Sequence, residues 1–296
     1  MTLKRIIFAL LLFSTALAAV RPSLAAATQA PQRPTPLASG AQTSAGPTAG
    51  AGLLHLPPTT DPGSQKAKQL LEQMVEALGG QAYLEVQNMQ QSGRTYGFYK
   101  GEPSGAGALF WRFWKWPDKD RIELTKQRDV VTLFAGDQGY DITYRGTAAV
   151  EAAQLEDYLR RRNHSLPWVL RRWLGPGTIV LYEGQGVAER RQAEKVSIFN
   201  AQDDSVTLAI DSNNHLPLRV SFVWRDPKTR DRTEEAEGYD NYRPVQGIMT
   251  PFSITRYRNG EPTNQRFLTE TRYNQNLADS LFQATVTLDA GKSRRK

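Results

Sequence analysis

The chain of 296 residues contains no cysteine. Disulfide bonds, thiol catalysis and thiolate metal sites are therefore excluded, and no lipid can be attached to a cysteine that follows a leader peptide. Histidine is scarce as well: His55, His164 and His215 are the only three, and no two of them have the spacing of a zinc site. We accordingly expect neither a metal nor a cofactor.

Recognisable catalytic motifs are also missing. The sequence has no Gly-x-Ser-x-Gly elbow and no Walker loop, and Gly184-Gln185-Gly186 is only a fragment of a dinucleotide fingerprint. The acidic pair Asp203-Asp204 is explained by turn chemistry, and strand alternation divides Glu234, Glu235 and Glu237 between two faces. These absences favour a binding protein over an enzyme, and a hydrolase assembled from distant residues stays as the less favoured alternative.

Excess positive charge is confined to the two ends of the chain. The formal net charge is +7, but four basic residues precede residue 61 and four follow residue 289, without acidic residues among them. The remaining 29 basic residues face all 30 acidic residues. Because nucleic-acid binding requires a basic patch on the folded domain itself, we do not expect a nucleic-acid partner.

Residues 1–25 have the layout of a secretory signal peptide. Lys4 and Arg5 precede an apolar run over Ile6–Val20, and small residues typical of a cleavage site follow it. The alternative is a membrane anchor, but the run is shorter than the roughly 20 residues that a membrane-spanning helix needs. We therefore predict a cleaved signal peptide and an exported protein.

The rest of the chain divides by composition. Residues 26–60 are rich in Ala, Pro, Thr and Gly with almost no charge, which predicts a disordered linker. Residues 61–289 carry the periodic patterns of one folded domain, and residues 290–296 are expected to form a basic disordered tail. A helix is expected to begin at Asp61 or Ser64, to carry one apolar stripe and to end at Gly79-Gly80.

The pattern after this helix is mostly that of strands. Period-2 alternation and short turn signals predict about eleven strands in an antiparallel meander, and residues 276–282 predict a closing helical turn. We therefore expect an α+β fold that is mostly β. Only Glu151–Leu174 interrupts the rhythm, with two short amphipathic helices that are expected to lie across the sheet as a lid. The alternative is a permanent plug.

Residues 108–116 are the densest aromatic stretch and are predicted to form a strand. Its aromatic side chains fall on both faces, with Phe110, Trp114 and Trp116 on one and Trp111 and Phe113 on the other. A two-layer core needs only one such face. Either the protein covers both faces of the sheet, or one face looks into a cavity.

Several short motifs together resemble the LolA-like family of outer-membrane lipoprotein carriers and sorting proteins. They are the signal peptide, the striped helix, the strand turn Trp116-Pro117-Asp118-Lys119-Asp120-Arg121, the hairpin Gly136-Asp137-Gln138-Gly139, the helical lid, Leu216-Pro217-Leu218, Gly247-Ile248-Met249-Thr250-Pro251, and Asn276 with Phe282. The match covers about Gln65 to Phe282. The resemblance implies an incomplete antiparallel barrel whose apolar concave side, covered by helices, accepts acyl chains.

The resemblance also implies which residues form the ligand site. The apolar cavity would be lined by Phe110, Trp114, Trp116, Ile122 and Leu124, and the lid would contribute Leu166, Val169, Leu170 and Trp173. One departure concerns Trp116: the dedicated carrier has an arginine at this position, which holds the lid closed by hydrogen bonds. A tryptophan cannot donate in the same way, so lid closure is expected to depend on packing, if the lid opens at all.

We therefore expect a monomeric, periplasmic protein, not an enzyme, that sequesters lipid or lipoprotein acyl chains. The alternative is an envelope sensor that uses the same fold to bind a membrane protein as its partner. If a cavity exists, Trp116→Ala and Leu170→Ala should weaken lipid binding more than stability.

Overall fold

The structure is a computed structural model that describes residues 53–288. The predicted signal peptide (residues 1–25), most of the predicted linker and the basic tail (residues 290–296) lie outside the described residues. Over residues 53–288, none of the helices combines the length and the apolar character needed to span a bilayer.

Fourteen strands form one antiparallel sheet. They are β1 (Asn88–Tyr99), β2 (Glu102–Pro103), β3 (Ala108–Lys115), β4 (Lys119–Leu124), β5 (Val130–Ala135), β6 (Gln138–Thr143), β7 (Gly146–Ala149), β8 (Ile179–Ala188), β9 (Arg191–Phe199), β10 (Ser205–Asp211), β11 (Pro217–Arg225), β12 (Arg232–Val245), β13 (Ile248–Arg258) and β14 (Glu261–Tyr273). The helices are α2 (Pro62–Leu78), α3 (Gln81–Leu84), α4 (Ala152–Asn163), α5 (Leu166–Trp168), the π-helix η1 (Val169–Trp173) and the 3₁₀ helix η2 (Asp279–Phe282).

The sheet consists of two meanders that meet in its middle. Its order is β7-β6-β5-β4-β3-β1-β14-β13-β12-β11-β10-β9-β8, so the first meander runs outward from β1 and the second returns from the opposite edge to β14. The edge strands β7 and β8 do not pair with each other, and the sheet stays open. This confirms the predicted incomplete barrel. The prediction of about eleven strands omitted the short strands β2 and β7.

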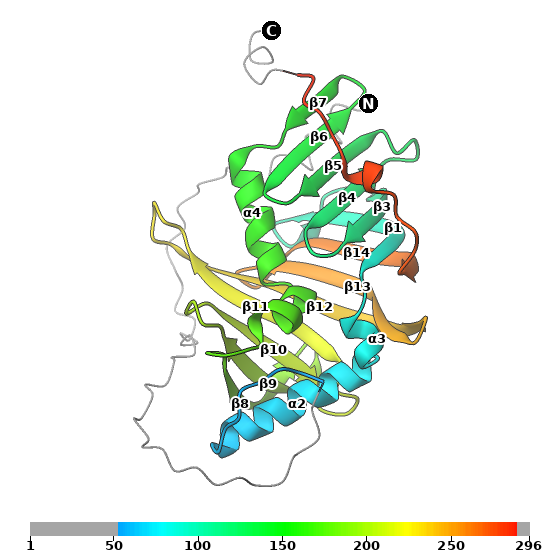
Figure 1. The fold of residues 1–296 in the computed structure, drawn as a ribbon. Helices are drawn as coiled ribbons and strands as arrows, with labels where there is room; N and C mark the ends of the chain where they lie inside the picture. The colour runs from blue at the N-terminus through cyan, green and yellow to red at the C-terminus, as the bar shows by residue number, and fades with distance from the viewer. Residues whose placement is uncertain (1–52, 289–296) are drawn as a thin grey trace.

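The topology explains the helical interruption. Because β7 and β8 lie at opposite edges of the sheet, the chain between them must cross its whole width. Helices α4, α5 and η1 make this crossing, and α4 lies over one face of the sheet (Figure 1). We call residues 152–173 the helical crossover. Helix α2 packs against β8, β9 and β13.

Helix α2 forms as its sequence predicts. The Asp61 side chain caps it by accepting a hydrogen bond from the Ser64 backbone N–H at 2.7 Å. Its apolar stripe is 0–2% exposed and comprises Ala67, Leu70, Leu71, Met74, Val75 and Leu78. Gly79 ends the helix at φ +124°, where a Cβ would lie 2.6 Å from the Gly247 carbonyl oxygen.

The chain just before α2 is packed as well. Leu54 is 8% exposed and belongs to the main hydrophobic core. The backbone N–H groups of Leu53 and Leu54 each donate to the Glu72 carboxylate at 3.1 Å. The last residues of the segment predicted as a linker therefore pack along α2.

The two aromatic faces of β3 have different surroundings. Phe110 lies in the main core, together with the stripe of α2 and residues of η1. On the opposite face, the Arg128 guanidinium lies 5.2 Å from the Trp111 ring and 5.5 Å from the Phe113 ring. Phe113 also packs against the cluster that Leu133, Leu277 and Phe282 form. The segment containing η2 thus covers the outer face, where the helical turn predicted for residues 276–282 is confirmed.

Candidate functional site

A cavity of about 530 Å³ lies between the sheet and the helical crossover. Its walls come from strands of both meanders, and its roof comes from α4, α5 and the turn between them. Ligand pockets in proteins span about 300–1,000 Å³, so this volume is enough for a small-molecule ligand. The cavity is at the place expected from the sequence, beside the aromatic strand β3 and beneath the helices.

The cavity is apolar at one end and charged at the other. Along β13, Met249 and Ile254 precede Arg256, and all three line the cavity. Strand β12 runs antiparallel, so Tyr239 lies opposite Ile254, and Glu237 lies opposite Arg256. The apolar end is completed by Leu78, Tyr83, Val86, Met89, Trp114, Leu166, Pro167, Tyr242 and Tyr273. The lining is therefore amphiphilic, whereas the resemblance implied an apolar one.

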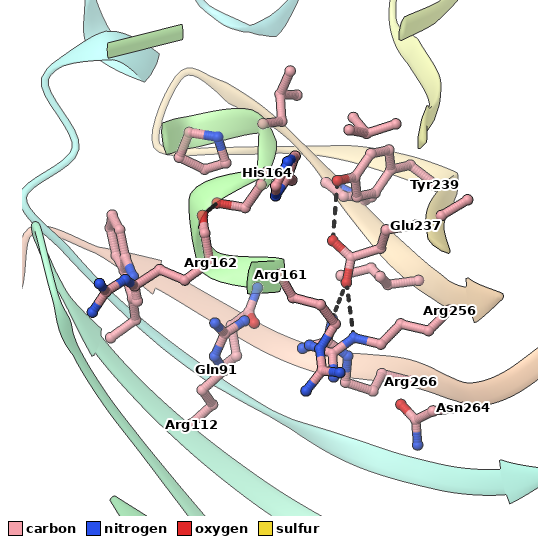
Figure 2. Close-up of a pocket in the computed structure, with 18 of the residues that line it drawn as sticks. Gln91, Arg112, Arg161, Arg162, His164, Glu237, Tyr239, Arg256, Asn264 and Arg266 are labelled. Carbon is pink, nitrogen blue, oxygen red and sulfur yellow. Dashed lines mark hydrogen bonds and ion pairs between the residues drawn. The ribbon is translucent and has the colours of Figure 1, made fainter. Parts of the chain in front are cut away.

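Ion pairs hold the floor of the charged end. The Arg112 guanidinium binds the Asp120 carboxylate through two hydrogen bonds of 2.8 and 2.9 Å. The Glu237 carboxylate accepts from Arg266 at 2.7 Å and from Arg256 at 3.3 Å (Figure 2). The Tyr239 hydroxyl donates to Glu237 at 3.0 Å. The charged groups come from β3, β4, β12, β13 and β14, which span the seam between the two meanders.

Ion pairs also attach α4 to the sheet. Glu235 accepts hydrogen bonds from Arg160 at 3.0 Å, from Arg258 at 3.4 Å and from the Trp224 indole N–H at 2.9 Å. The Arg161 guanidinium pairs with Asp157 and lies 3.9 Å from Glu235. No residue of α4 is fully buried. The helix is therefore held mainly by charge, together with the Tyr158 ring that stacks on Phe134.

Positive charge exceeds negative charge on the cavity wall. Seven arginines line it against four carboxylates: Arg112, Arg161, Arg162, Arg171, Arg256, Arg258 and Arg266 against Asp120, Asp157, Glu235 and Glu237. Burial and the neighbouring charge of Arg256 lower the pKa of Arg161 to about 9 and that of Arg266 to about 10. Burial alone would raise the pKa of Glu237, but the charges of Arg266 and Arg256 outweigh it and lower this pKa to about 2.

Apart from Trp116, which is described below, the residues predicted from the sequence divide into three groups. Trp114 and Leu166 line the cavity. Phe110, Val169, Leu170 and Trp173 are at most 8% exposed and belong to the main core. Ile122 and Leu124 lie opposite Arg112 and Phe110 in the neighbouring strand and are partly buried. Ligand contact stays a prediction for all of them.

Sequence reasoning missed the charged residues of the site. Alternation places Glu235 and Glu237 on the same face of β12, and this signal was present in the sequence. Their partners Arg256 and Arg266 lie on other strands, and only the register of the sheet brings them together. Over residues 53–288, no group of three or more His, Asp or Glu side chains is placed to hold a metal ion.

Trp116 lies beneath the helical crossover. Its ring is 5.5 Å from that of Trp168, and the Arg171 guanidinium lies 4.7 Å above it. Arg171 also donates hydrogen bonds to the backbone carbonyls of Val86 at 2.7 Å and Tyr83 at 2.9 Å. The cover is thus closed by hydrogen bonds as well as by packing, and the arginine that makes them belongs to the cover rather than to the strand turn.

We expect Arg171→Ala to loosen the cover. The substitution removes two hydrogen bonds from a charged donor, so local opening should become about tenfold more frequent. Hydrogen exchange of the backbone amides in residues 166–173 measures this directly.

The neighbouring Arg172→Ala serves as the control for this prediction. Arg172 is exposed and only stacks on Trp116 and Trp168, at 5.6 Å from each ring. Its removal should leave hydrogen exchange in the crossover nearly unchanged. Equal effects of the two substitutions would contradict a specific role for the Arg171 hydrogen bonds.

Comparisons with known proteins identify the fold. No protein-family model matches the chain, and no curated protein matches it in sequence. A solved structure of a DUF1329 family protein from Desulfovibrio piger is similar over 73% of this chain and 97% of that one, with 12% identity and a TM-score of 0.52. A putative outer membrane lipoprotein-sorting protein domain from Vibrio parahaemolyticus is similar over 74% of this chain and 97% of its own, with 10% identity and a TM-score of 0.46. A LolA superfamily protein from Nitrosomonas europaea is similar over 73% of this chain and 97% of its own, with 13% identity and a TM-score of 0.45.

The similarity extends over nearly the whole length of each of these proteins and over the described domain of this chain. Because the sequences are only 10–13% identical, this similarity is one of fold alone. The open antiparallel sheet with its helical cover is the architecture that the sequence motifs implied. The chain therefore has a fold similar to that of the DUF1329 family protein.

Proposed function

We propose that the protein is a periplasmic binding protein that holds a lipid, or the acyl chain of a lipoprotein, in the cavity beneath the helical crossover. The observation that carries the proposal is the unfilled apolar end of the cavity, where Trp114, Met249 and Ile254 meet Leu166 of the roof. Burial of one CH₂ group is worth about 0.8 kcal/mol, so a chain lying there needs no specific polar contact.

The charged groups support binding rather than catalysis. The low pKa of Glu237 keeps this carboxylate ionised at neutral pH, and its oxygens are occupied by Arg266, Arg256 and Tyr239. A general base needs a pKa near the working pH and a free acceptor. We propose that these groups form a fixed electrostatic environment for a ligand, within a lipoprotein-sorting role of the kind that the sequence resemblance implies.

A series of n-alkanols from hexanol to decanol tests the apolar end. If the alkyl chain enters it, each added CH₂ should tighten binding about fourfold, because 0.8 kcal/mol corresponds to that ratio. Isothermal titration calorimetry with the described domain measures the affinities.

Two tryptophan substitutions sharpen this test. Met249→Trp adds volume on the cavity wall and should abolish the dependence on chain length. Val187→Trp introduces the same side chain at a position that is 69% exposed and outside the cavity, and it should change nothing. An affinity that does not increase with chain length in the unmodified protein would refute the proposed function.

A further inference from the structure

We infer that the charged end of the cavity binds the anionic headgroup of the ligand, and that this headgroup is a phosphate. The inference rests on the proposed function and makes it more specific: the ligand would be a phosphorylated amphiphile, with its chain at the apolar end and its phosphate among the arginines.

The cavity wall lacks enough negative charge for its arginines. Each of the four lining carboxylates is already paired with at least one arginine: Asp120 with Arg112, Asp157 with Arg161 and Arg258, Glu235 with Arg258, and Glu237 with Arg256 and Arg266. Arg171 lies at the apolar end, where it binds the carbonyls of Val86 and Tyr83, so the charged end has six arginines against four carboxylates, an excess of two positive charges. An uncompensated charge with restricted access to water raises the free energy of the folded state, so the site favours an anion.

Several buried polar atoms of the cavity wall lack hydrogen-bond partners within residues 53–288, namely the Nε atoms of Arg162, Arg171 and Arg266 and the Oε1 of Gln91. Arg266 is 8% exposed, and its Nε has no partner among the described residues. Gln91 is 6% exposed, its Oε1 also has none, and it lies directly opposite Arg112 in the neighbouring strand. Buried polar atoms are nearly always paired in folded proteins. A ligand phosphate would accept from the Arg266 Nε–H, whereas the Gln91 Oε1 is an acceptor and would need a hydroxyl group of the ligand as its donor.

The arginines that face this position come from three different elements. Arg256 lies on β13, Arg266 on β14, and Arg161 on α4 above them. Figure 2 shows these three side chains converging beside Glu237. Arginine binds phosphate oxygens in a fixed fork geometry, and a phosphate group offers three oxygens to several forks at once. A bound phosphate would therefore join the sheet to its helical cover.

The size of the charge excess favours phosphate over a carboxylate. A phosphate monoester carries about −1.5 to −2 charges at neutral pH, whereas a carboxylate carries one. Only the phosphate compensates both excess positive charges of the charged end. A fatty acid would leave the site more positive.

Four probes of defined chemistry test the inference by calorimetry. Decanol, decyl phosphate and decyltrimethylammonium have the same chain with a neutral, an anionic and a cationic headgroup, and inorganic phosphate has the headgroup alone. We expect decyl phosphate to bind about tenfold or more tightly than decanol, and the cationic compound to bind more weakly than decanol. Inorganic phosphate should bind far more weakly than decyl phosphate.

Three variants test whether the preference for decyl phosphate over decanol arises at the charged end of the cavity. Arg161→Gln removes one arginine of the group and leaves the pairs of Glu237 intact. Gln91→Glu introduces an anion of the protein itself at the site. Both should reduce decyl phosphate affinity about tenfold and leave decanol affinity unchanged. Arg191→Gln, which removes an arginine paired with Asp211 and Asp240 outside the cavity, should affect neither probe.

The outcomes separate this inference from the proposed function. Equal affinities for the three decyl compounds, or unchanged decyl phosphate binding in both cavity variants, would overturn the headgroup site while the chain site stands. Binding of inorganic phosphate as tight as that of decyl phosphate would instead refute the chain site. Because Gln91→Glu adds compensating charge to the arginines, it should fold even if Arg161→Gln does not, and a thermal melt checks this.

Discussion

Substitution of Glu237 by glutamine should lower the free energy of unfolding by about 3 kcal/mol at pH 7. The carboxylate is the shared partner of Arg266 and Arg256, and its pKa of about 2 lies below the ordinary value of 4.5 because of their charges. A glutamine keeps the shape but leaves the arginines with one negative charge fewer. Chemical denaturation of both proteins measures the difference.

The pH dependence gives an independent check of this prediction. Because the pKa of Glu237 is lower in the folded state, its stabilising effect is complete above about pH 4.5 and is lost as the pH falls toward 2. The difference in the free energy of unfolding between the unmodified protein and Glu237→Gln should therefore decrease as the pH falls from 4.5 to 2. Glu234→Gln is the control, since its side chain is 47% exposed and lies 3.9 Å from Arg219. If Glu234→Gln lowered the free energy of unfolding as much as Glu237→Gln does, a special role of Glu237 would be contradicted.

The second large effect is expected from Leu170→Ala, which should lower the free energy of unfolding by about 2–5 kcal/mol. Leu170 lies in η1, is 5% exposed and packs within the main core. It does not line the cavity, so ligand affinity should change little in protein that remains folded. This reverses, for Leu170, the expectation drawn from the sequence, in which binding was to suffer more than stability.

A matched truncation at the surface controls for this effect. Val187→Ala removes apolar groups at a position that is 69% exposed, and its free energy of unfolding should change by no more than about 0.5 kcal/mol. If Leu170→Ala instead reduced alkanol affinity and left stability intact, η1 would be a mobile part of the lid rather than a part of the core.

Much of the fold could be predicted because its elements carry strong local signals. The single apolar stripe and capping residue of α2 set its limits, and period-2 alternation with turn residues located the strands of both meanders. The four-residue strand β7, Gly146–Ala149, lacks β-branched or aromatic residues except Thr147, so its pattern was too weak. The pairing of β1 with β14 joins residues about 180 positions apart, which no local pattern reveals.

The location of the cavity could be predicted, but the chemistry of its lining could not. The aromatic strand β3 and the helical interruption indicated a covered hollow, and the structure has a cavity there. Its charge arises from residues that look isolated in the sequence, such as Arg112, Glu237 and Arg266. The ion-pair partners of each depend on the register of the sheet, which is a property of the assembled domain.

The arrangement of the two meanders has a consequence for how the chain folds. The helical crossover is the covalent link between them, while the centre of the sheet depends on hydrogen bonds between its first and last long strands, β1 and β14. That seam cannot close until Tyr273 has been synthesised. Until then β1 has an unpaired edge that can associate with other chains, and the high contact order slows its protection. The nascent chain is therefore most prone to aggregation just before strand β14 becomes available.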